Sequence, residues 1–256
     1  MSKSRPKPQK QTPQKPLQVG TDIALNQETW SFADALEQFD EHILQSVPNC
    51  QQQREYIASL SRFFLHANAR VYEIGVSTGG LAEVVLERTP ERNLSYIGLD
   101  VEASMVHKAN QRLSHDKRFQ AVCANAVEYP FDQPDPPTLV ISYYTLQFVP
   151  RPERKRLLKR IFDALAPGGA LILYEKTLGE DAQIQDMLTQ LYFDFKSEQG
   201  LSADSILNKA IALRGVSMPL SLSGNQQLLQ ETGFSSVEMI YRAYCFAGYL
   251  AIKNAT

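Results

Sequence analysis

The sequence predicts an α/β protein with a doubly wound, mostly parallel sheet of seven strands. Three observations predict it. Short apolar segments alternate with helical segments from about residue 70 to residue 175. The connections between these segments are short, which requires parallel strands joined by right-handed helical crossovers. Two further strand-like segments close the chain and are expected to pair antiparallel.

Two helices are expected before the first strand. Hydrophobic residues recur at helical spacing from Trp30 to Leu44, and Ser46-Val-Pro48 ends that run. A second helix is expected to carry a hydrophobic face of Tyr56, Ile57, Leu60, Phe63, Phe64 and Leu65.

The repeating part of the chain follows in order. The expected strands are 70–74, 94–99, 119–124, 138–143, 170–175, 237–241 and 244–252. The expected helices are 81–88, 103–113, 152–165 and 226–231. A helical insertion from about 181 to 220 interrupts the alternation before the last two strands. Residues 25–256 are therefore expected to form a single domain.

Composition excludes several classes of protein. Residues 1–24 form a basic, proline-rich and glutamine-rich segment that cannot bury a core, so we expect a disordered tail. The net charge of −2 gives no reason to expect a nucleic-acid partner. No apolar run is long enough to span a membrane and no signal peptide is visible, so a cytoplasmic protein is expected. Three dispersed cysteines predict free thiols, and four histidines without ligand spacing predict no metal site.

The loop after the first strand is the strongest functional signal. Glu73 ends the strand, and Gly75, Ser77 and Gly79 form a tight turn directly before a helix. In a doubly wound sheet, ligands bind at the carboxyl ends of the strands beside such turns. Asp100 ends the second strand, where a carboxylate accepts hydrogen bonds from ribose hydroxyls. The alternative interpretation is an ordinary strand-to-helix turn.

Asp100 alone does not separate NAD from S-adenosylmethionine (SAM), but the loop favours SAM. The dinucleotide pattern would read Gly75-x-Ser77-x-x-Gly80, which keeps only two of three glycines. Glu73 before the first glycine is the arrangement typical of SAM sites, where it can hold the methionyl ammonium. Asn125, after the third strand, is expected to meet the adenine, unless it is a simple loop residue.

Aromatic side chains are expected at the sulfur end of the cofactor. Tyr143 and Tyr144 follow the fourth strand, and Tyr174 ends the next one. Their ring faces could stabilise a sulfonium cation, so all three are candidate catalytic residues and Tyr143 is also a candidate cofactor contact. The alternative is that these rings only pack.

The sequence resembles the carboxy-SAM synthases, a branch of the class I methyltransferase fold. The resemblance runs from about Trp30 to Ala251. It rests on Ser46-Val-Pro48, Gly75-Val-Ser77-Thr-Gly79, Thr145-Leu-Gln-Phe148, Pro152-Glu-Arg154, Leu157-Leu158, Pro167-Gly-Gly-Ala-Leu-Ile-Leu-Tyr-Glu-Lys176, Asp194-Phe-Lys196 and Gly200-x-Ser202. It implies SAM bound by Glu73, Gly75, Asp100 and Asn125, and a homodimer.

The departures from that family concern the reaction. The family's arginine for the extra carboxylate of carboxy-SAM is Ala210 here, next to a retained lysine, Lys209, and one helical turn before Arg214. Losing that bidentate cation removes the main reason to expect carboxy-SAM chemistry. A family tyrosine is Cys50 here. Further replacements put Tyr143, Tyr144 and Tyr174 in place of asparagine, phenylalanine and serine.

Two enzymatic hypotheses follow. In the first, the enzyme transfers the SAM methyl group to a small acceptor molecule, which requires chiefly proximity and alignment. In the second, SAM is itself the substrate, and its amine attacks the γ-carbon to give azetidine-2-carboxylate and methylthioadenosine, as in some enzymes that resemble this branch. Carboxy-SAM synthesis, or SAM binding without turnover, are further alternatives.

Overall fold

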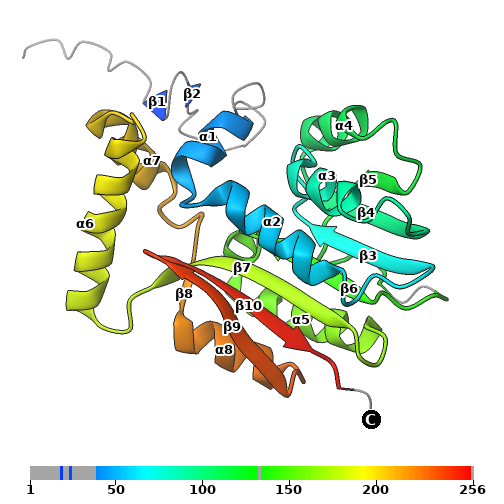
Figure 1. Ribbon diagram of the computed structural model, residues 1–256. Coiled ribbons are helices and arrows are strands. Elements are labelled where there is room, and N and C mark those ends of the chain that lie inside the picture. Colours follow the sequence, from blue (N-terminus) through cyan, green and yellow to red (C-terminus); the bar gives the residue numbers. More distant parts are fainter. Residues whose placement is uncertain (1–17, 20–22, 25–38, 132–133, 255–256) are drawn as a thin grey trace, which may run out of the picture.

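The computed structural model describes residues 18–19, 23–24, 39–131 and 134–254. An eight-stranded sheet runs through its centre (Figure 1). The strands are β3 (Ala69–Ile74), β4 (Leu94–Asp100), β5 (Phe119–Cys123), β6 (Leu139–Tyr143), β7 (Ala170–Leu178), β8 (Leu220–Ser221), β9 (Ser236–Ala243) and β10 (Phe246–Ile252). They follow the order β5-β4-β3-β6-β7-β10-β9, with β8 paired to β7 beside this path.

The predicted doubly wound sheet is confirmed. Strands β3 to β7 pair parallel, and β10 pairs antiparallel with both β7 and β9. The order reverses between β3 and β6, so the carboxyl ends of these two strands open a crevice. The two-residue strand β8 was not predicted, because so short a segment has no hydrophobic periodicity.

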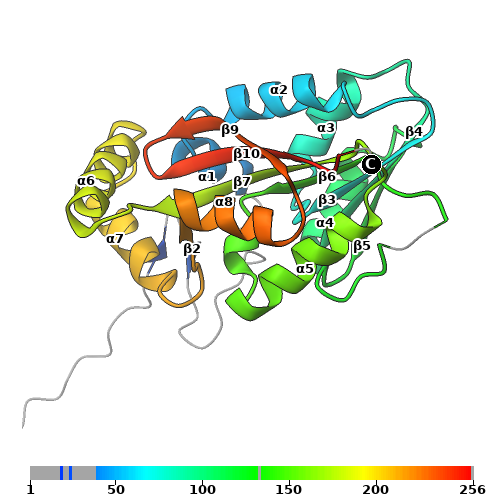
Figure 2. The ribbon, with the colours of Figure 1, turned by 90° about the horizontal axis from the view of Figure 1, so that it is seen from below.

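Helices cover both faces of the sheet (Figure 2). They are α1 (Phe39–Ser46), α2 (Cys50–Ser61), α3 (Gly80–Glu87), α4 (Ala103–Arg112), α5 (Arg151–Ala164), α6 (Ala182–Glu198), α7 (Ala203–Ala212) and α8 (Leu222–Glu231). One core packs α2, α3 and α4 on one face, and a second core packs α5 and α8 on the other. Side chains of successive strand residues alternate between the two cores, as in Ile172 and Leu173.

The predicted helical insertion consists of two helices, α6 and α7, beyond the end of β7. Helix α7 begins where the Ser202 hydroxyl accepts a hydrogen bond from the backbone of Ser205 at 3.2 Å. A third small core, with Val47, Tyr192 and Phe246 among its buried residues, lies between α1, α6 and the β9–β10 hairpin. The insertion therefore closes one end of the crevice.

The second N-terminal helix differs from its prediction. Helix α2 begins at Cys50 and ends at Ser61, so Phe63 to Leu65 lie past its end and Phe63 is 79% exposed. Its buried stripe is Cys50, Gln53, Ile57, Ala58 and Ser61, while Tyr56 is exposed. The hydrophobic pattern did not predict this face because polar residues occupy part of it, and one of them, Gln53, accepts a hydrogen bond from Tyr144.

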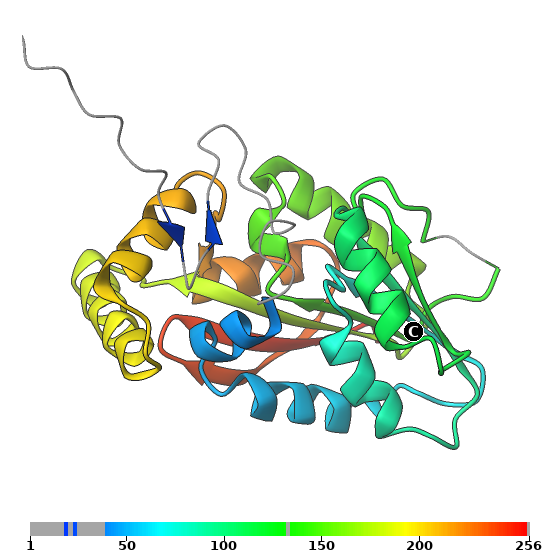
Figure 3. The ribbon, with the colours of Figure 1, turned by 90° about the horizontal axis from the view of Figure 1, so that it is seen from above.

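Most of the N-terminal tail lies outside the described residues, as does the beginning of the first predicted helix at Trp30. Within it, β1 (Gln18–Val19) and β2 (Ile23–Ala24) pair antiparallel, and β1 lies against α7 (Figure 3, dark blue beside orange). In the described part of the chain, no helix is long and apolar enough to cross a membrane.

Candidate active site

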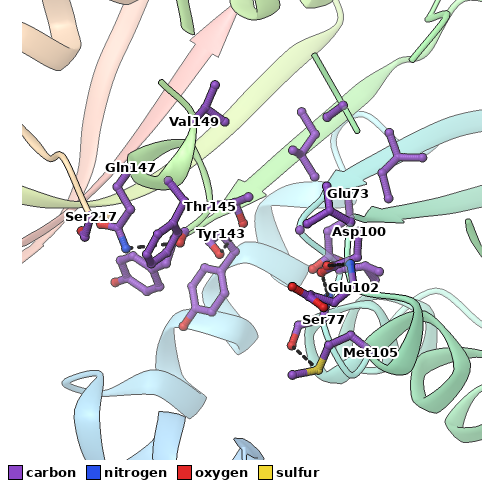
Figure 4. A pocket seen from close by; sticks show the side chains of 18 of the residues that line it. Glu73, Ser77, Asp100, Glu102, Met105, Tyr143, Thr145, Gln147, Val149 and Ser217 are labelled. Carbon is purple, nitrogen blue, oxygen red and sulfur yellow. Dashed lines mark hydrogen bonds between the residues drawn. The ribbon is translucent and has the colours of Figure 1, made fainter. Parts of the chain in front are cut away.

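A cavity of about 680 Å³ opens at the carboxyl ends of β3, β4 and β6. Figure 4 shows Glu73, Ser77, Asp100 and Met105 gathered at one side, Gln147 and Ser217 at the other, and Tyr143 between them. The expected cofactor residues Glu73, Gly75, Ser77, Asp100, Asn125 and Tyr143 all line this cavity, and so does Tyr144. Gly79 and Tyr174 are not among the lining residues.

The loop after β3 has the conformation that its glycines predict. Gly75 has a φ of +74°, and a Cβ atom there would collide with the side chain of Thr145. Ser77 also adopts a left-handed φ of +51°, which glycine prefers at this position of the pattern. Gly79, with a φ of +81°, is the N-cap of α3. Its function is therefore to shape the turn behind the cavity wall.

Asp100 holds the loop in place, and its carboxylate oxygens can still accept hydrogen bonds from a ligand. Its two oxygens accept one backbone hydrogen bond each, from Ser77 at 2.8 Å and from Glu102 at 3.0 Å. Burial raises the pKa of Asp100, and these two hydrogen bonds oppose that shift. A carboxylate has further lone pairs, so both oxygens can still accept hydroxyl donors from the cavity.

Asn125 lies at the mouth of the cavity. Its side-chain Oδ1 accepts the backbone N–H of Val127 at 3.0 Å, which orients the amide. The side chain is exposed, with the cavity on one side of it. This position suits a contact with a flat base at the edge of the site.

Glu73 is a buried acid, 2% exposed, on the floor of the cavity. Burial raises the pKa of its carboxyl to about 8, against a hydrogen bond from the Tyr96 hydroxyl at 2.7 Å and the charge of Arg54. A carboxyl with this pKa can take or hold a proton near neutral pH. Arg54 was not predicted as a site residue; the signal that could have found it is a charged residue next to the buried stripe of α2.

Tyr143 and Tyr144 form an aromatic wall in the middle of the cavity. Their ring centroids are 4.6 Å apart, and the ring of Phe246 lies 5.3 Å from that of Tyr144. Tyr144 has a left-handed φ of +59°, an unfavourable conformation for a bulky residue that is typical of functional sites. Its hydroxyl donates to Gln53 Oε1 at 2.7 Å, so α2 holds the ring in place.

The Tyr143 hydroxyl lies 3.5 Å from the sulfur of Cys50. Cys50 and Tyr143 are both positions where this chain departs from the family that it resembles. The resemblance places a tyrosine at the first and an asparagine at the second. The two positions are therefore in contact in this structure.

The sequence predicted Tyr174 at the rim of the cavity, but the structure does not place it there. It is fully buried on the α2 face of the sheet, behind the wall, with its ring centroid 5.7 Å from Tyr143 and 6.1 Å from Tyr144. Side chains alternate along β7, and the position of Tyr174 directs its ring toward the helices. Any effect of Tyr174 on the site therefore acts through the two tyrosines of the wall.

A buried polar network holds the loop that follows the wall. Gln147 Oε1 accepts the backbone N–H of Lys176 at 3.1 Å, and Gln147 Nε2 donates to the Tyr144 carbonyl at 3.3 Å. The guanidinium of Arg154 donates to the Gln147 carbonyl at 3.0 Å. Burial raises the pKa of Glu175 to about 8, and the charge of Arg154 and the backbone of this loop oppose the shift. The shared Thr145-Leu-Gln-Phe148 motif is therefore a structural support of the site.

Solved structures of low sequence identity share this fold. Human N-acetylserotonin methyltransferase in complex with SAM superposes with a TM-score of 0.61 at 20% identity, covering 88% of this chain and 57% of that one. Phosphoethanolamine N-methyltransferase 2 of Haemonchus contortus, also in complex with SAM, has a TM-score of 0.60 at 19% identity, covering 90% of this chain and 62% of that one. The chain thus spans about three fifths of these longer proteins.

Residues 71–169 match the family model of the methyltransferase domain. The strand order, the loop after β3 and these matches define a class I SAM-dependent enzyme of the methyltransferase fold. The carboxy-S-adenosyl-L-methionine synthase of Staphylococcus epidermidis is 31% identical over 88% of this chain and 97% of its own length. The synthase of Pseudomonas putida is 32% identical over 93% of this chain and 95% of its own length. The chain belongs to the carboxy-S-adenosyl-L-methionine synthase family.

Proposed function

We propose that this enzyme uses SAM itself as its substrate and closes the methionyl chain to azetidine-2-carboxylate, releasing methylthioadenosine. The observation that carries the proposal is the buried Glu73 carboxyl, with its pKa of about 8, close to the aromatic wall. An α-amino group has an unperturbed pKa of about 8, so this carboxyl is matched to accept the proton of the methionyl ammonium.

The lining residues suggest how SAM lies in the cavity. In this proposal the ribose hydroxyls bind at Asp100 and the adenine at Asn125, two residues that line the cavity on the β4 and β5 side. The methionyl ammonium binds at Glu73, below the Gly75 loop. The sulfonium then lies near Tyr143 and Tyr144, where ring faces would stabilise its positive charge.

The proposed step is an intramolecular displacement. Glu73 accepts a proton from the ammonium, and the neutral amine attacks the γ-carbon. The bond between this carbon and sulfur breaks with its electron pair on sulfur, which leaves the neutral thioether of methylthioadenosine. The new ring nitrogen carries the positive charge, and the proton on Glu73 passes to solvent. The wall contributes by holding the chain bent, which places the amine close to the carbon it attacks.

The family's own reaction is less well supported by this cavity. Ala210 stands where the resemblance places the arginine for the extra carboxylate, and a methyl side chain makes no hydrogen bond. Arg214, one turn further along the chain, is not among the residues that line the cavity. Carboxy-SAM synthesis is therefore the weaker hypothesis here.

Methyl transfer to a small acceptor is the second candidate function. The observation that favours it is the extent of the cavity, which continues past the aromatic wall to Lys176 and Lys209. An acceptor that lies there would approach the sulfonium methyl group from the β7 side.

Incubation of the purified enzyme with SAM alone, followed by mass spectrometry, separates the two. We expect methylthioadenosine and azetidine-2-carboxylate in equal amounts, above the spontaneous background. The appearance of S-adenosylhomocysteine only on addition of a cell extract would instead support methyl transfer. Formation of carboxy-SAM on addition of prephenate would contradict the interpretation of Ala210.

The same assay tests the aromatic wall. Replacement of Tyr144 by alanine should lower turnover by more than about threefold, because a cation–π contact contributes about 1 kcal/mol. Tyr144→Phe keeps the ring and should retain most of the activity. Equal activity in Tyr144→Ala and Tyr144→Phe would show that the ring does not contact the reacting sulfur.

We further propose that the chain forms a homodimer, as its family resemblance implies. Ile184, Met187 and Leu191 lie at helical spacing on α6, and each is at least 41% exposed. Figure 1 shows α6 as the outermost helix at its end of the molecule. An exposed apolar stripe on an outer helix is typical of an interface. Sedimentation velocity at micromolar concentration should find a dimer that Met187→Glu dissociates, and a monomeric wild type would rule the dimer out.

A further inference from the structure

Three lysines from different elements converge at the end of the cavity opposite Asp100. Lys176 of β7 and Lys209 of α7 line the cavity, and the Nζ of Lys176 lies 5.0 Å from the ring centroid of Tyr192. Lys196 of α6 is only 5% exposed, and its Nζ lies 4.5 Å from the same ring. Two ammonium groups therefore contact the Tyr192 ring, which also lines the cavity.

His42 of α1 completes this cluster. Its Nε2 contacts the Nζ of Lys209, and the side chain is buried. Burial and the charges of Lys209 and Lys196 lower the pKa of His42 to about 3, so the ring is neutral. The unprotonated Nε2 therefore accepts a hydrogen bond from the Lys209 ammonium and adds no negative charge.

The cluster has no counter-charge in the described part of the chain. No ion pair there joins Lys176, Lys196 or Lys209 to a carboxylate. Burial, together with the charges of neighbouring lysines, lowers the pKa of Lys209 to about 7 and that of Lys196 to about 8. Bringing cations together away from water is costly unless an anion joins them.

The acids of the cavity lie elsewhere. Those that line it are Glu73, Asp100, Glu102, Glu128 and Glu153. They come from β3, β4, α5 and adjoining loops, whereas the lysines come from β7, α6 and α7. Arg54 and Arg156 also line the cavity, and they lie with these acids, beside Glu73 and Glu153. Charges are therefore mixed at that end, whereas the lysine end has cations without a paired carboxylate in the described part of the chain.

We propose that Lys176 and Lys209, supported by the charge of Lys196, form a subsite for a carboxylate at the lysine end of the cavity. Ammonium groups from two elements, aimed at one space beside an aromatic ring, fit a carboxylate that has left water. The carboxylate has two sources, the methionyl group of a bent SAM or a separate small acid. The carboxylate subsite rests on the proposed function in one respect, namely that SAM occupies the rest of the cavity.

Binding of two nucleosides distinguishes the sources. S-adenosylhomocysteine carries the carboxylate, and methylthioadenosine lacks the whole amino-acid part. If the methionyl carboxylate occupies the subsite, Lys209→Met and Lys176→Met each weaken S-adenosylhomocysteine binding about 10- to 100-fold in isothermal titration. Methylthioadenosine binding stays unchanged. Lys155→Met on α5, an exposed lysine paired with Glu231, is the matched control.

A separate acid gives a different pattern. Phenylacetate is then expected to bind the wild type saturated with methylthioadenosine and to lose binding about 10- to 100-fold in the two variants, while S-adenosylhomocysteine is unaffected. Lys209→Arg keeps the charge and should restore much of either effect. If neither probe responds to any of the lysine substitutions, the subsite is wrong.

Thermal unfolding of the same variants provides a second measurement. Removing one ammonium from a repulsive buried cluster should raise the unfolding midpoint of the empty protein, whereas loss of a purely structural lysine would lower it. A lowered midpoint in both variants would contradict the proposal. If S-adenosylhomocysteine fails to bind the wild type, the proposed function is wrong for a reason independent of the lysines, and the phenylacetate titration still decides the subsite.

Discussion

Replacing Glu73 with glutamine is expected to lower turnover of SAM by about 100- to 10,000-fold, the usual range for a lost general base. The amide keeps an oxygen for the Tyr96 hydroxyl, which now lies 2.7 Å from Glu73 Oε2, so the floor of the cavity stays intact. It cannot accept the proton of the methionyl ammonium. Glu87→Gln, the same change on the exposed end of α3, is the control. A loss of less than threefold would exclude Glu73 as the proton acceptor.

The same substitution is expected to stabilise the empty protein. Burial raises the pKa of Glu73 from 4.5 to about 8, so the folded protein binds more protons than the unfolded chain between these values. Stability therefore falls as the pH rises from 4.5 to 8, by about 3 kcal/mol up to pH 7. Glutamine removes this loss. Urea unfolding at pH 5 and pH 7 should show a gain for Glu73→Gln that is larger at pH 7.

Activity should have the opposite pH dependence. Glu73 must be deprotonated to accept a proton, so kcat/KM is expected to rise with pH up to about 8 in the wild type. The ammonium of free SAM titrates in the same range. The pH profile of the residual activity of Glu73→Gln should show only the titration of the substrate ammonium. The difference between the wild-type and variant profiles then gives the contribution of Glu73. If Glu73 both lowers the stability of the empty protein and is required for turnover, its burial serves function and not stability.

The sequence predicted the fold because the order of its elements is a local property. Apolar strands such as 170–175 and glycine turns such as the one at Gly75 are visible in any short window of the chain. The residues at the ends of parallel strands meet at one edge of the sheet, and Glu73, Asp100, Asn125 and Tyr143 line the same cavity there. The parallel topology alone brings these strand ends together.

The parts that were missed come from elements that no periodicity places. Arg54 lines the cavity from α2, and Gln53 of the same helix accepts the hydrogen bond from Tyr144. The hydrophobic pattern did not predict the buried face of α2, because polar residues occupy part of it. Lys196 is distant in sequence from the strand ends and joins the site only through the packing of α6. Tyr174 was predicted at the end of its strand, but β7 continues to Leu178, so Tyr174 lies inside the sheet and not at its edge. Tertiary packing, and not local pattern, decides such positions.

Asp100→Asn is expected to weaken binding of methylthioadenosine by about 30- to 1,000-fold, because two hydroxyl hydrogen bonds to a charged acceptor are lost or weakened. The change is conservative for the loop, since one amide oxygen still accepts a backbone N–H. The amide nitrogen, however, would face the N–H of Ser77 or Glu102, which now bond the two oxygens at 2.8 Å and 3.0 Å.

A matched ligand separates loss of the ribose contact from damage to the loop. A 2′,3′-dideoxy analogue of methylthioadenosine has no hydroxyls for Asp100, so its weak affinity should be nearly the same in the wild type and in Asp100→Asn. Asp163→Asn, on the far helix α5, should leave both ligands unaffected. If the dideoxy analogue loses as much affinity as methylthioadenosine, Asp100 acts through the loop, and the ribose lies elsewhere. A selective loss places the ribose at the end of β4, which in turn directs the methionyl chain toward Glu73 and the aromatic wall.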